Sequence, residues 1–584
     1  SMSLFGEYTL ENSSDTDRDL LSLLFMEAEA YKGHYNLEAL LESNEKLDNL
    51  PVQPMYLATK KCTSDQLALL VEKLSSAQRQ YFIDIDLWQK DHLDVASFER
   101  WITSYLKCKD EQIVEDFISG ESFLLYLKGR FDIKTFDVED PMYPDHDQYF
   151  LTDDGLLLFE YEEDYPYVDQ IKNLLRHLYS RWGVERAYAH IFKIVSDCYA
   201  NVEEAGYQFK KSRLEDIGIV DYYESLKLLA NFPSMSHVNS FIKNKKELTA
   251  ELDSVQKLQR LHANQIVPFR KGFDKIHTGL SKIKDSDRSY YLQFNFIRLV
   301  NSVLAFEGAL KESSLTMNRH GVEVSNSLKL GFEYIDFYLQ YSNANLPEQG
   351  IFALFDFSEI YKVGKSIVAI SQRKLKAKLR KFGFEELGEQ KFFGVHLNKT
   401  LEEALDGPGH YSKGLDEKKV SLEKLEDFHQ WEKEIEFLIR LIPYIQSFHQ
   451  SYSQLVEGEY LQDQFYLNYN VAEIDFESII LSSLINYSLG SLQNEEKKMG
   501  VTKSELTSFW NRFFDCEGKT QFNENTDEFQ KMTDEFISTF GFAEIPGLPS
   551  FLQKIVSWHL SGYDISELKG DEYQHVGGPI LLQS

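Results

Sequence analysis

Apolar side chains recur three and four positions apart along most of the chain, which is the spacing of one face of an α-helix. The clearest run comprises Leu67, Leu70, Val71 and Leu74. It lies between two capping boxes, Thr63-x-x-Gln66 and Ser75-x-x-Gln78, which mark helix starts. Short segments of this kind follow one another through residues 17–130, joined by polar turns. They predict a right-angled helical stack or small solenoid.

The pattern changes between Asp137 and Asp169. These 33 residues contain 12 acidic side chains, three prolines and neither lysine nor arginine, so we expect no continuous helix. Apolar runs at 149–152 and 156–161 flank Asp153-Asp154-Gly155, and glycine accepts the positive φ that a tight turn requires. The segment therefore predicts a β-hairpin over 149–161 with its turn centred on Asp154-Gly155.

Helical periodicity returns after residue 170, so the expected fold class is mainly α. The expected parts are an N-terminal helical stack (1–135), an acidic segment with the hairpin (136–170), a central helical domain (171–385), a loop region (386–420) and a C-terminal helical domain (421–584). The loop region is predicted from its glycines, at 394, 407, 409 and 414. A helix ending near Lys381 is followed by Gly383, which can take the left-handed cap conformation.

Charge and cysteine content indicate which kinds of partner and which cellular compartment to expect. The chain has 62 basic and 93 acidic residues, a formal net charge of −31, which argues against binding nucleic-acid backbones. No uninterrupted apolar run approaches 18 residues, so we expect no membrane insertion. The four cysteines are widely separated and form no CxxC pair: Cys62, Cys108, Cys198 and Cys516. Such spacing is typical of reduced thiols and predicts a cytoplasmic protein.

Several collinear motifs resemble an uncharacterised bacterial family, labelled only as a domain of unknown function and associated with delta-proteobacteria. They cover roughly residues 50–385 and include Ile83–Trp88, Phe150–Gly155, Arg213–Gly218, Leu330–Tyr334 and Tyr361–Ser366. The N-terminal helices are also similar in spacing to the superhelical domains of magnesium-transporter and flagellar-switch proteins. The family resemblance implies kinship without a known reaction, and likeness in helix spacing implies no function.

Gly364-Lys365-Ser366 looks like the end of a phosphate-binding loop. That motif needs another glycine five residues before Gly364, where this chain has Glu359, and it needs a preceding strand. The flanking apolar residues instead continue a helical face. We therefore expect helix packing, with Gly364 allowing another helix to approach closely.

Catalytic and metal-binding signatures are missing from the sequence. Asp145-His146-Asp147 offers metal-ligand atoms, but adjacent residues of one turn rarely face one ion, so a solvated loop is the preferred interpretation. Neither HExxH nor G-x-S-x-G occurs, and Cys198 fits a packed helix position. We expect no catalytic residue, metal or cofactor.

A cationic cluster stands out in this acidic chain. It places six basic residues within nine positions: Arg373, Lys374, Lys376, Lys378, Arg380 and Lys381. Leu375 and Leu379 lie four apart and could be buried while the charges face outward. The cluster could bind an anion or an acidic partner, or contact the acidic hairpin within the chain. Alternatively, its cations simply complement the negative end of a helix.

A second polar set surrounds Arg213. Glu204, Arg213, Asp216 and Glu224 could form a pocket with shifted pKa values. Alternatively, Arg213 joins two helices through one carboxylate and no ligand is involved.

Two functions follow as hypotheses. The first is a cytoplasmic scaffold whose acidic, aromatic segment meets another protein, with Glu162, Glu163 and Asp164 as the candidate binding face. A solvated edge that discourages strand pairing is the alternative explanation of that face. The second hypothesis is a protein that binds, or acts on, an anionic small molecule in a pocket between the central and C-terminal helices.

Overall fold

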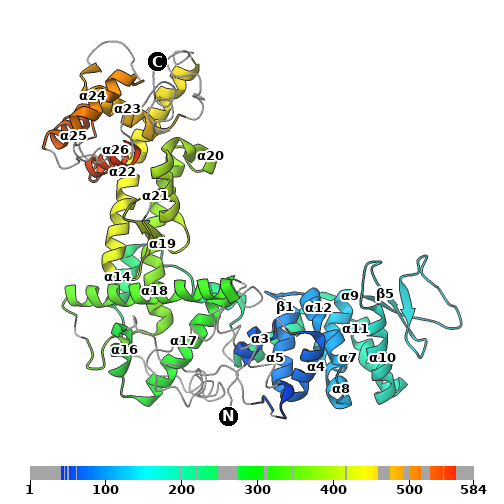
Figure 1. The fold of residues 1–584 in the computed structure, drawn as a ribbon. Helices are drawn as coiled ribbons and strands as arrows, with labels where there is room; N and C mark the ends of the chain where they lie inside the picture. The colour runs from blue at the N-terminus through cyan, green and yellow to red at the C-terminus, as the bar shows by residue number, and fades with distance from the viewer. Residues whose placement is uncertain are drawn as a thin grey trace. The chain divides into compact units, whose positions relative to one another are not determined.

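The fold is mainly α, as predicted (Figure 1). The structure is a computed structural model, and it describes residues 41–44, 46–48, 52–60, 62–197, 199–216, 220–246, 274–307, 314–344, 346–414, 417–457, 474–491, 500–513, 527–542 and 545–560. The start of the predicted stack, at 17–40, lies outside these residues, as do Cys198 and Cys516. None of the described helices is both long and apolar enough to cross a membrane.

The chain divides into two compact units. Unit 1 consists of Ser1–Asn231 with Asn239–Gly364, and unit 2 of Phe232–Val238 with Lys365–Ser584. The division falls inside a continuous helix, α19 (Phe357–Lys381). The five segments that we inferred from composition stay a prediction.

Unit 1 begins with short helices whose starts the sequence marks. They are α3 (Val52–Thr59), α4 (Ser64–Lys73), α5 (Ser76–Leu87), α6 (Val95–Phe98), α7 (Arg100–Leu106), α8 (Glu111–Ile118) and α9 (Glu121–Arg130), with a small strand pair, β1 (Trp88–Gln89) and β2 (His92–Leu93). Thr63 and Ser75 form the predicted capping boxes at α4 and α5. Leu67, Leu70 and Val71 are buried, and α4 packs against α7.

The predicted hairpin is present and belongs to a three-stranded antiparallel sheet. Its order is β3 (Asp132–Thr135), β5 (Leu157–Glu160), β4 (Tyr149–Leu151). The turn lies one residue earlier than predicted. The Gly155 N–H donates to the Thr152 carbonyl at 2.8 Å, so the turn is centred on Asp153-Asp154, and Gly155 comes directly after it with a φ of +70°. The Asp154 carboxylate stabilises this turn by accepting the Thr152 hydroxyl and the Leu156 N–H. The sequence did not predict β3, because Ile133 is its one buried apolar residue and a single apolar residue gives no alternating strand pattern.

The remaining helices of this part differ in length. They are α10 (Val168–Trp182), α11 (Val184–Val195), α12 (Tyr199–Asp216), α13 (Tyr222–Leu228), α14 (Met235–Lys243), α16 (Asp274–Ser281), α17 (Ser286–Glu307), α18 (Ser314–Tyr341) and the 3-10 turn η5 (Ile351–Ala353), followed by α19. Of those from α10 to α18, the longer ones are α10, α12, α17 and α18. Helices α18 and α19 meet backbone to backbone at two glycines. A Cβ on Gly364 would lie 2.0 Å from the Ser327 carbonyl oxygen, and one on Gly331 would lie 2.0 Å from that of Ile360.

Unit 2 contains the second part of α19 and the C-terminal helices. Its further elements are α20 (Leu387–Gln390), η6 (Lys391–Phe393), α21 (Val395–Leu405), β6 (His410–Ser412), β7 (Lys419–Ser421), α22 (Leu425–Glu457), α23 (Phe476–Ser488), α24 (Lys503–Phe513), α25 (Asp527–Thr539) and α26 (Leu548–Leu560). Much of 386–420 is thus ordered secondary structure rather than the expected loop. Two of its glycines border a helix: Gly394 precedes α21 with a φ of +99°, and Gly407 follows it.

Candidate functional site

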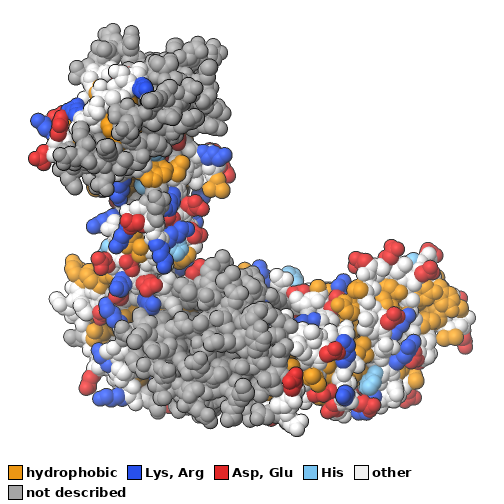
Figure 2. Space-filling view, viewed as in Figure 1, with side chains coloured by type: hydrophobic (Ala, Val, Ile, Leu, Met, Phe, Trp, Pro, Cys, Tyr) orange, Lys and Arg blue, Asp and Glu red, His pale blue; other side chains and the backbone are white. Residues whose placement is uncertain are grey.

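The loop at 136–148 and the hairpin turn expose a group of apolar side chains. These side chains and their exposed fractions are Val138 (64%), Met142 (81%), Tyr143 (57%) and Leu156 (37%). Figure 2 shows orange side chains at the right-hand edge, where Figure 1 places the hairpin, with red side chains around them. We call these four residues, with the carboxylates of residues 137–147 and of the exposed residues 162–164, the acidic apolar surface.

Aromatic contacts hold this surface in place. Tyr143 lies between Phe136 and Tyr149, with ring centroids 5.3 and 6.1 Å away. On the hairpin, Phe150 stacks on Phe159 at 5.0 Å, and both rings are buried against Phe131. The apolar side chains are therefore presented by a packed platform.

Most carboxylates of the segment form no ion pair with lysine or arginine in the part of the chain that the structure describes. Within the described residues, only Asp153 pairs with an arginine (Arg176, 3.5 Å) and only Glu160 with a lysine (Lys134, 3.0 Å). The others form no ion pair with lysine or arginine there: Asp137, Glu139, Asp140, Asp145, Asp147, Asp154, Glu162, Glu163, Asp164 and Asp169. Such a group of unneutralised carboxylates produces a negative potential over an apolar surface.

The predicted acidic face lies between β5 and α10. Glu162, Glu163 and Asp164 are all exposed, whereas the next residue, Tyr165, is buried and shares a hydrogen bond with the Tyr126 hydroxyl. Tyr161 N–H donates to the Gln148 carbonyl. The acidic face therefore leaves the sheet beside the end of the 136–148 loop.

The cationic cluster follows the surface of α19. Leu375 and Leu379 are buried (0% and 2% exposed), while five of the six cations are exposed and Lys378 is half-buried. The cations do not converge on one point. Arg373 donates to the Phe232 carbonyl at 2.9 Å, and Arg380 pairs with Glu385 at 3.0 Å. Lys374 and Lys381 remain on the exposed side of the helix.

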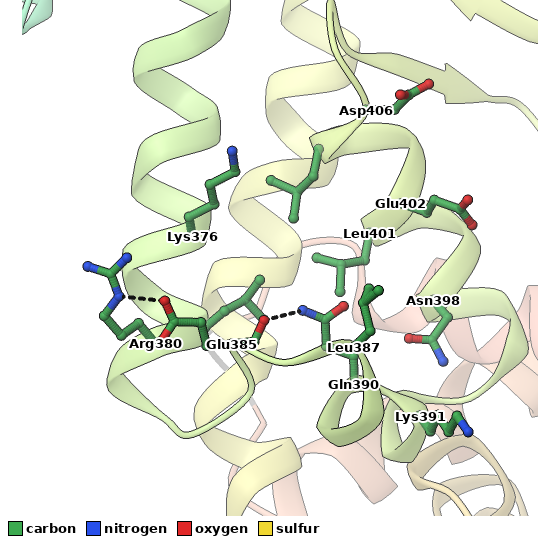
Figure 3. A pocket seen from close by; sticks show the side chains of 12 residues that line it. Lys376, Arg380, Glu385, Leu387, Gln390, Lys391, Asn398, Leu401, Glu402 and Asp406 are labelled. Carbon is green, nitrogen blue, oxygen red and sulfur yellow. Dashed lines mark hydrogen bonds and ion pairs between the residues drawn. The ribbon is translucent and has the colours of Figure 1, made fainter. Parts of the chain in front are cut away.

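Two of these cations line a groove of about 650 Å³ in unit 2 (Figure 3). Lys376, Leu379 and Arg380 come from α19, and the remaining lining comes from α20, η6, α21 and the connecting residues. The other lining residues are Glu385, Leu387, Gln390, Lys391, Asn398, Leu401, Glu402, Leu405 and Asp406. Three cations thus face three carboxylates, so the lining does not favour an anion.

Of the set predicted around Arg213, the three residues whose side chains are described have separate partners. Arg213 donates two bonds of 2.8 Å to the fully buried carboxylate of Asp84 in α5. Glu204 accepts from Gln208, and Glu224 lies 3.7 Å from Lys211. The side chain of Asp216 lies outside the described residues.

The Asp84–Arg213 pair joins α5 to α12, 129 positions apart. The Asp84 carboxylate raises the pKa of the Arg213 guanidinium. Burial raises the pKa of Asp84, and the bonds from Arg213 oppose that rise. Nearby, Tyr223 donates to Asp91 at 3.1 Å. These contacts connect two motifs of the family resemblance, which therefore carry packing interactions.

Unit 2 buries titratable groups that no sequence pattern marked. Glu477 is 1% exposed and accepts the N–H groups of His396 and Leu397 at 3.1 and 3.0 Å, so it caps α21. Burial raises the pKa of Glu477 to about 8. Burial also lowers the pKa of His396 to about 4 and that of His559 to about 3, so both imidazoles are uncharged at neutral pH. None of these groups lines the groove, and we assign them to stability.

The described residues contain no group of three or more His, Cys, Asp or Glu side chains that could hold a metal ion. His146 instead accepts from the Gln148 N–H and contacts Glu160, both within the acidic segment. Ser366, at the end of the Gly-Lys-Ser motif, is fully buried and accepts the Phe232 N–H at 2.9 Å. Together with the Gly364 crossing, this contact fits the helix-packing interpretation.

Comparison with known proteins identifies a family for this chain but no function. No curated protein and no solved structure was found to match. One family model, described as Family of unknown function (DUF6178), matches residues 27–561. Nearly the whole chain is covered, including both units, the acidic segment and the groove. The chain therefore belongs to the DUF6178 family, whose function is unknown.

Proposed function

We propose that this chain is a protein-interaction scaffold and that its acidic apolar surface binds a basic, apolar segment of another protein. One observation carries the proposal: Met142 and Tyr143 are exposed (81% and 57%) on a packed platform, among carboxylates without lysine or arginine partners in the described structure. Exposed apolar patches with a polar rim are typical of interaction sites.

The two halves of this surface have different roles in binding. The apolar side chains supply affinity, because burying them removes apolar area from water. The carboxylates supply selectivity and speed, because a negative surface attracts a basic partner and repels acidic ones. The same charge disfavours nucleic acid and anionic membranes as partners.

The proposed compartment is the cytoplasm of a bacterial cell. Its support is that Cys62 and Cys108 are free thiols, as is usual in reducing compartments, together with the resemblance to a bacterial family. The likeness of the N-terminal helices to magnesium-transporter and flagellar-switch domains stays a prediction.

The second hypothesis, a site for an anionic small molecule, has weaker support. The groove of unit 2 has as many carboxylates as cations, and Arg380 is already neutralised by Glu385. An anion there would meet Glu402 and Asp406 as well as Lys376.

Photo-crosslinking in the native host tests the proposal. The photoreactive residue p-benzoylphenylalanine replaces Met142, and in a matched control it replaces Tyr341, an equally exposed aromatic (79%) on α18. We expect an adduct at position 142 that is absent at 341, with lysine or arginine beside apolar residues in the crosslinked peptide. The triple variant Glu162→Lys, Glu163→Lys, Asp164→Lys should slow association by about tenfold at low salt.

Two results would contradict the proposal. One is the same set of adducts at both positions, since that indicates random collisions. The other is an unchanged association rate of the triple lysine variant at low salt, because charge would then have no part in recognition and the acidic face would be a solvated edge.

A further inference from the structure

The groove of unit 2 has an apolar floor. Leu379 from α19 and Leu401 from α21 form it, and both are buried (2% exposed each). Leu405 is half-buried beside them. A volume of about 650 Å³ leaves room for several aliphatic side chains of a ligand, within the ~300–1,000 Å³ typical of binding sites.

The two walls carry opposite charge. Lys376 and Arg380 lie on α19 on one side, where Arg380 is paired with Glu385, while Glu402 on α21 and Asp406, the residue after α21, lie on the other (Figure 3). Within the described residues, neither Lys376 nor Glu402 has an ion-pair partner, and both are exposed. Among the lining residues of these two helices, the charge without an ion-pair partner in the described structure is therefore positive at Lys376 and negative at Glu402.

Leu387 stands at the groove with 83% of its surface exposed, the highest value among the exposed large apolar residues of the described structure. Its segment is held in place: the Gln390 side chain donates to the Phe384 carbonyl at 2.9 Å, and the buried Phe384 ring packs on Phe393 at 4.9 Å. An apolar side chain held outward loses little entropy when a partner covers it.

The walls are also fixed relative to each other. The Gln372 side chain on α19 donates to the carbonyls of Ala404 and Gly407, at 3.0 and 3.1 Å, at the end of α21. The groove is therefore already formed before a ligand binds, and a ligand need not open it.

We propose that this groove binds an amphipathic α-helix of a partner protein. The helix inserts leucine-type side chains at i, i+3 or i+4, and i+7 against the floor and Leu387. It presents carboxylates to the α19 wall and lysine or arginine to the α21 wall. Charge of both signs on the two walls excludes a uniformly acidic or uniformly basic helix.

This inference is independent of the proposed function. The groove lies in unit 2 and the acidic apolar surface in unit 1, and the two need partners of different chemistry. Loss of one site leaves the evidence for the other untouched.

A peptide-display selection tests the inference. A library of helical peptides with randomised faces is selected on the full chain and counter-selected on the variant Leu387→Asp. The matched control is Val395→Asp, since Val395 is also exposed (63%) and does not line the groove. Neither substitution disturbs a buried side chain, so both variants should fold, which circular dichroism checks.

We expect enriched peptides with an apolar stripe flanked by acidic residues on one side and basic residues on the other. Their affinity, measured by fluorescence anisotropy, should fall about tenfold or more in Leu387→Asp and stay unchanged in Val395→Asp. Lys376→Glu should weaken binding about three- to tenfold, and less at high salt.

Three results would overturn the inference. The first is a selection in which no peptide prefers the full chain over Leu387→Asp. The second is enrichment of peptides with flanks of a single sign. The third is a dimer of the chain that Leu387→Asp dissociates in sedimentation velocity, because the occupant would then be a second copy.

Discussion

The crossing of α18 and α19 allows a sharp prediction for Gly364→Ala. A Cβ at Gly364 would lie 2.0 Å from the Ser327 carbonyl oxygen and 2.8 Å from the Gly331 nitrogen. Ordinary contact begins near 3.4 Å, so the helices would have to separate by about 1.4 Å. Both clashing atoms belong to the backbone, and no rotamer change can relieve the overlap.

The magnitude follows from two opposing effects. Overpacking a well-packed contact costs about 1–3 kcal/mol, and more where the backbone must move. Separating the helices also loosens contacts of Ile360 and Val363, both fully buried. Against this, alanine in a helix interior is favoured over glycine by about 1 kcal/mol. Taking the upper end of the overpacking cost, because the backbone must move, and subtracting this gain, we expect Gly364→Ala to destabilise unit 1 by about 2 kcal/mol.

Urea denaturation followed by far-ultraviolet circular dichroism measures this cost, with two control variants. Gly206→Ala meets only the end of the flexible Leu125 side chain, at 2.4 Å, and should cost less. Gly388→Ala meets nothing within 4 Å and should be neutral or stabilising by up to about 1 kcal/mol. Combining Gly364→Ala with Gly331→Ala should cost less than the sum, because one separation relieves both clashes. If Gly364→Ala behaves like Gly388→Ala, the close crossing does not exist.

Three further outcomes are expected. Glu477→Gln should reduce the loss of stability of unit 2 as pH rises from 4.5 to about 8, because a carboxyl whose pKa is raised binds more protons folded than unfolded; part of that loss remains, because burial also raises the pKa of Glu434 to about 7. Unfolding free energies from urea titrations at pH 5 and 8.5 should show a slope smaller by up to about 1.4 kcal/mol per pH unit. Asp84→Asn should cost about 2–4 kcal/mol in the same assay, since Arg213 loses its buried partner, and a cost below about 1 kcal/mol would contradict this role. Leu375→Asp should strongly destabilise the chain by burying a charge, whereas Lys378→Glu should cost about 0–1 kcal/mol; equal costs would contradict the orientation of α19.

Interactions between residues close in sequence were predictable. The capping boxes at Thr63 and Ser75 need only a side chain and an N–H three positions away, so the sequence pattern is sufficient. The hairpin follows from Gly155 between two apolar runs, and the burial of Leu375 and Leu379 follows from their four-residue spacing. The interpretation of Gly364 as a packing residue rested on the missing glycine at 359.

Predictions that depended on one residue type alone were less accurate. The glycines of 386–420 indicated a loop, yet Gly394 and Gly407 border α21, because glycine is as useful at a helix end as in a loop. β3 escaped notice because its pattern is polar, and it forms only because β5 offers an edge with a matching register.

For the candidate sites, the sequence showed which charged residues each segment contains, and the tertiary structure determined which residues lie next to one another. Twelve carboxylates without a lysine or arginine in the same segment made residues 137–169 distinctive, but only the tertiary structure showed that Tyr143 packs between Phe136 and Tyr149 and that Met142 is exposed. Likewise, Lys376 was visible within a basic run, whereas the opposing Glu402 was not, because they lie on different helices.

By itself, the sequence determined the fold class, the helix starts at Thr63 and Ser75 and the hairpin, since these depend on hydrogen bonds and apolar spacing within a few residues. Only the tertiary structure decided that Arg213 meets Asp84 rather than a ligand, and that Glu477 caps a helix 81 positions away. Such pairs require distant segments to meet, and a carboxylate has the same local pattern whether its partner is solvent, an arginine or a backbone N–H. The partner is chosen by the path of the chain, which is set by the packing of all the helices together.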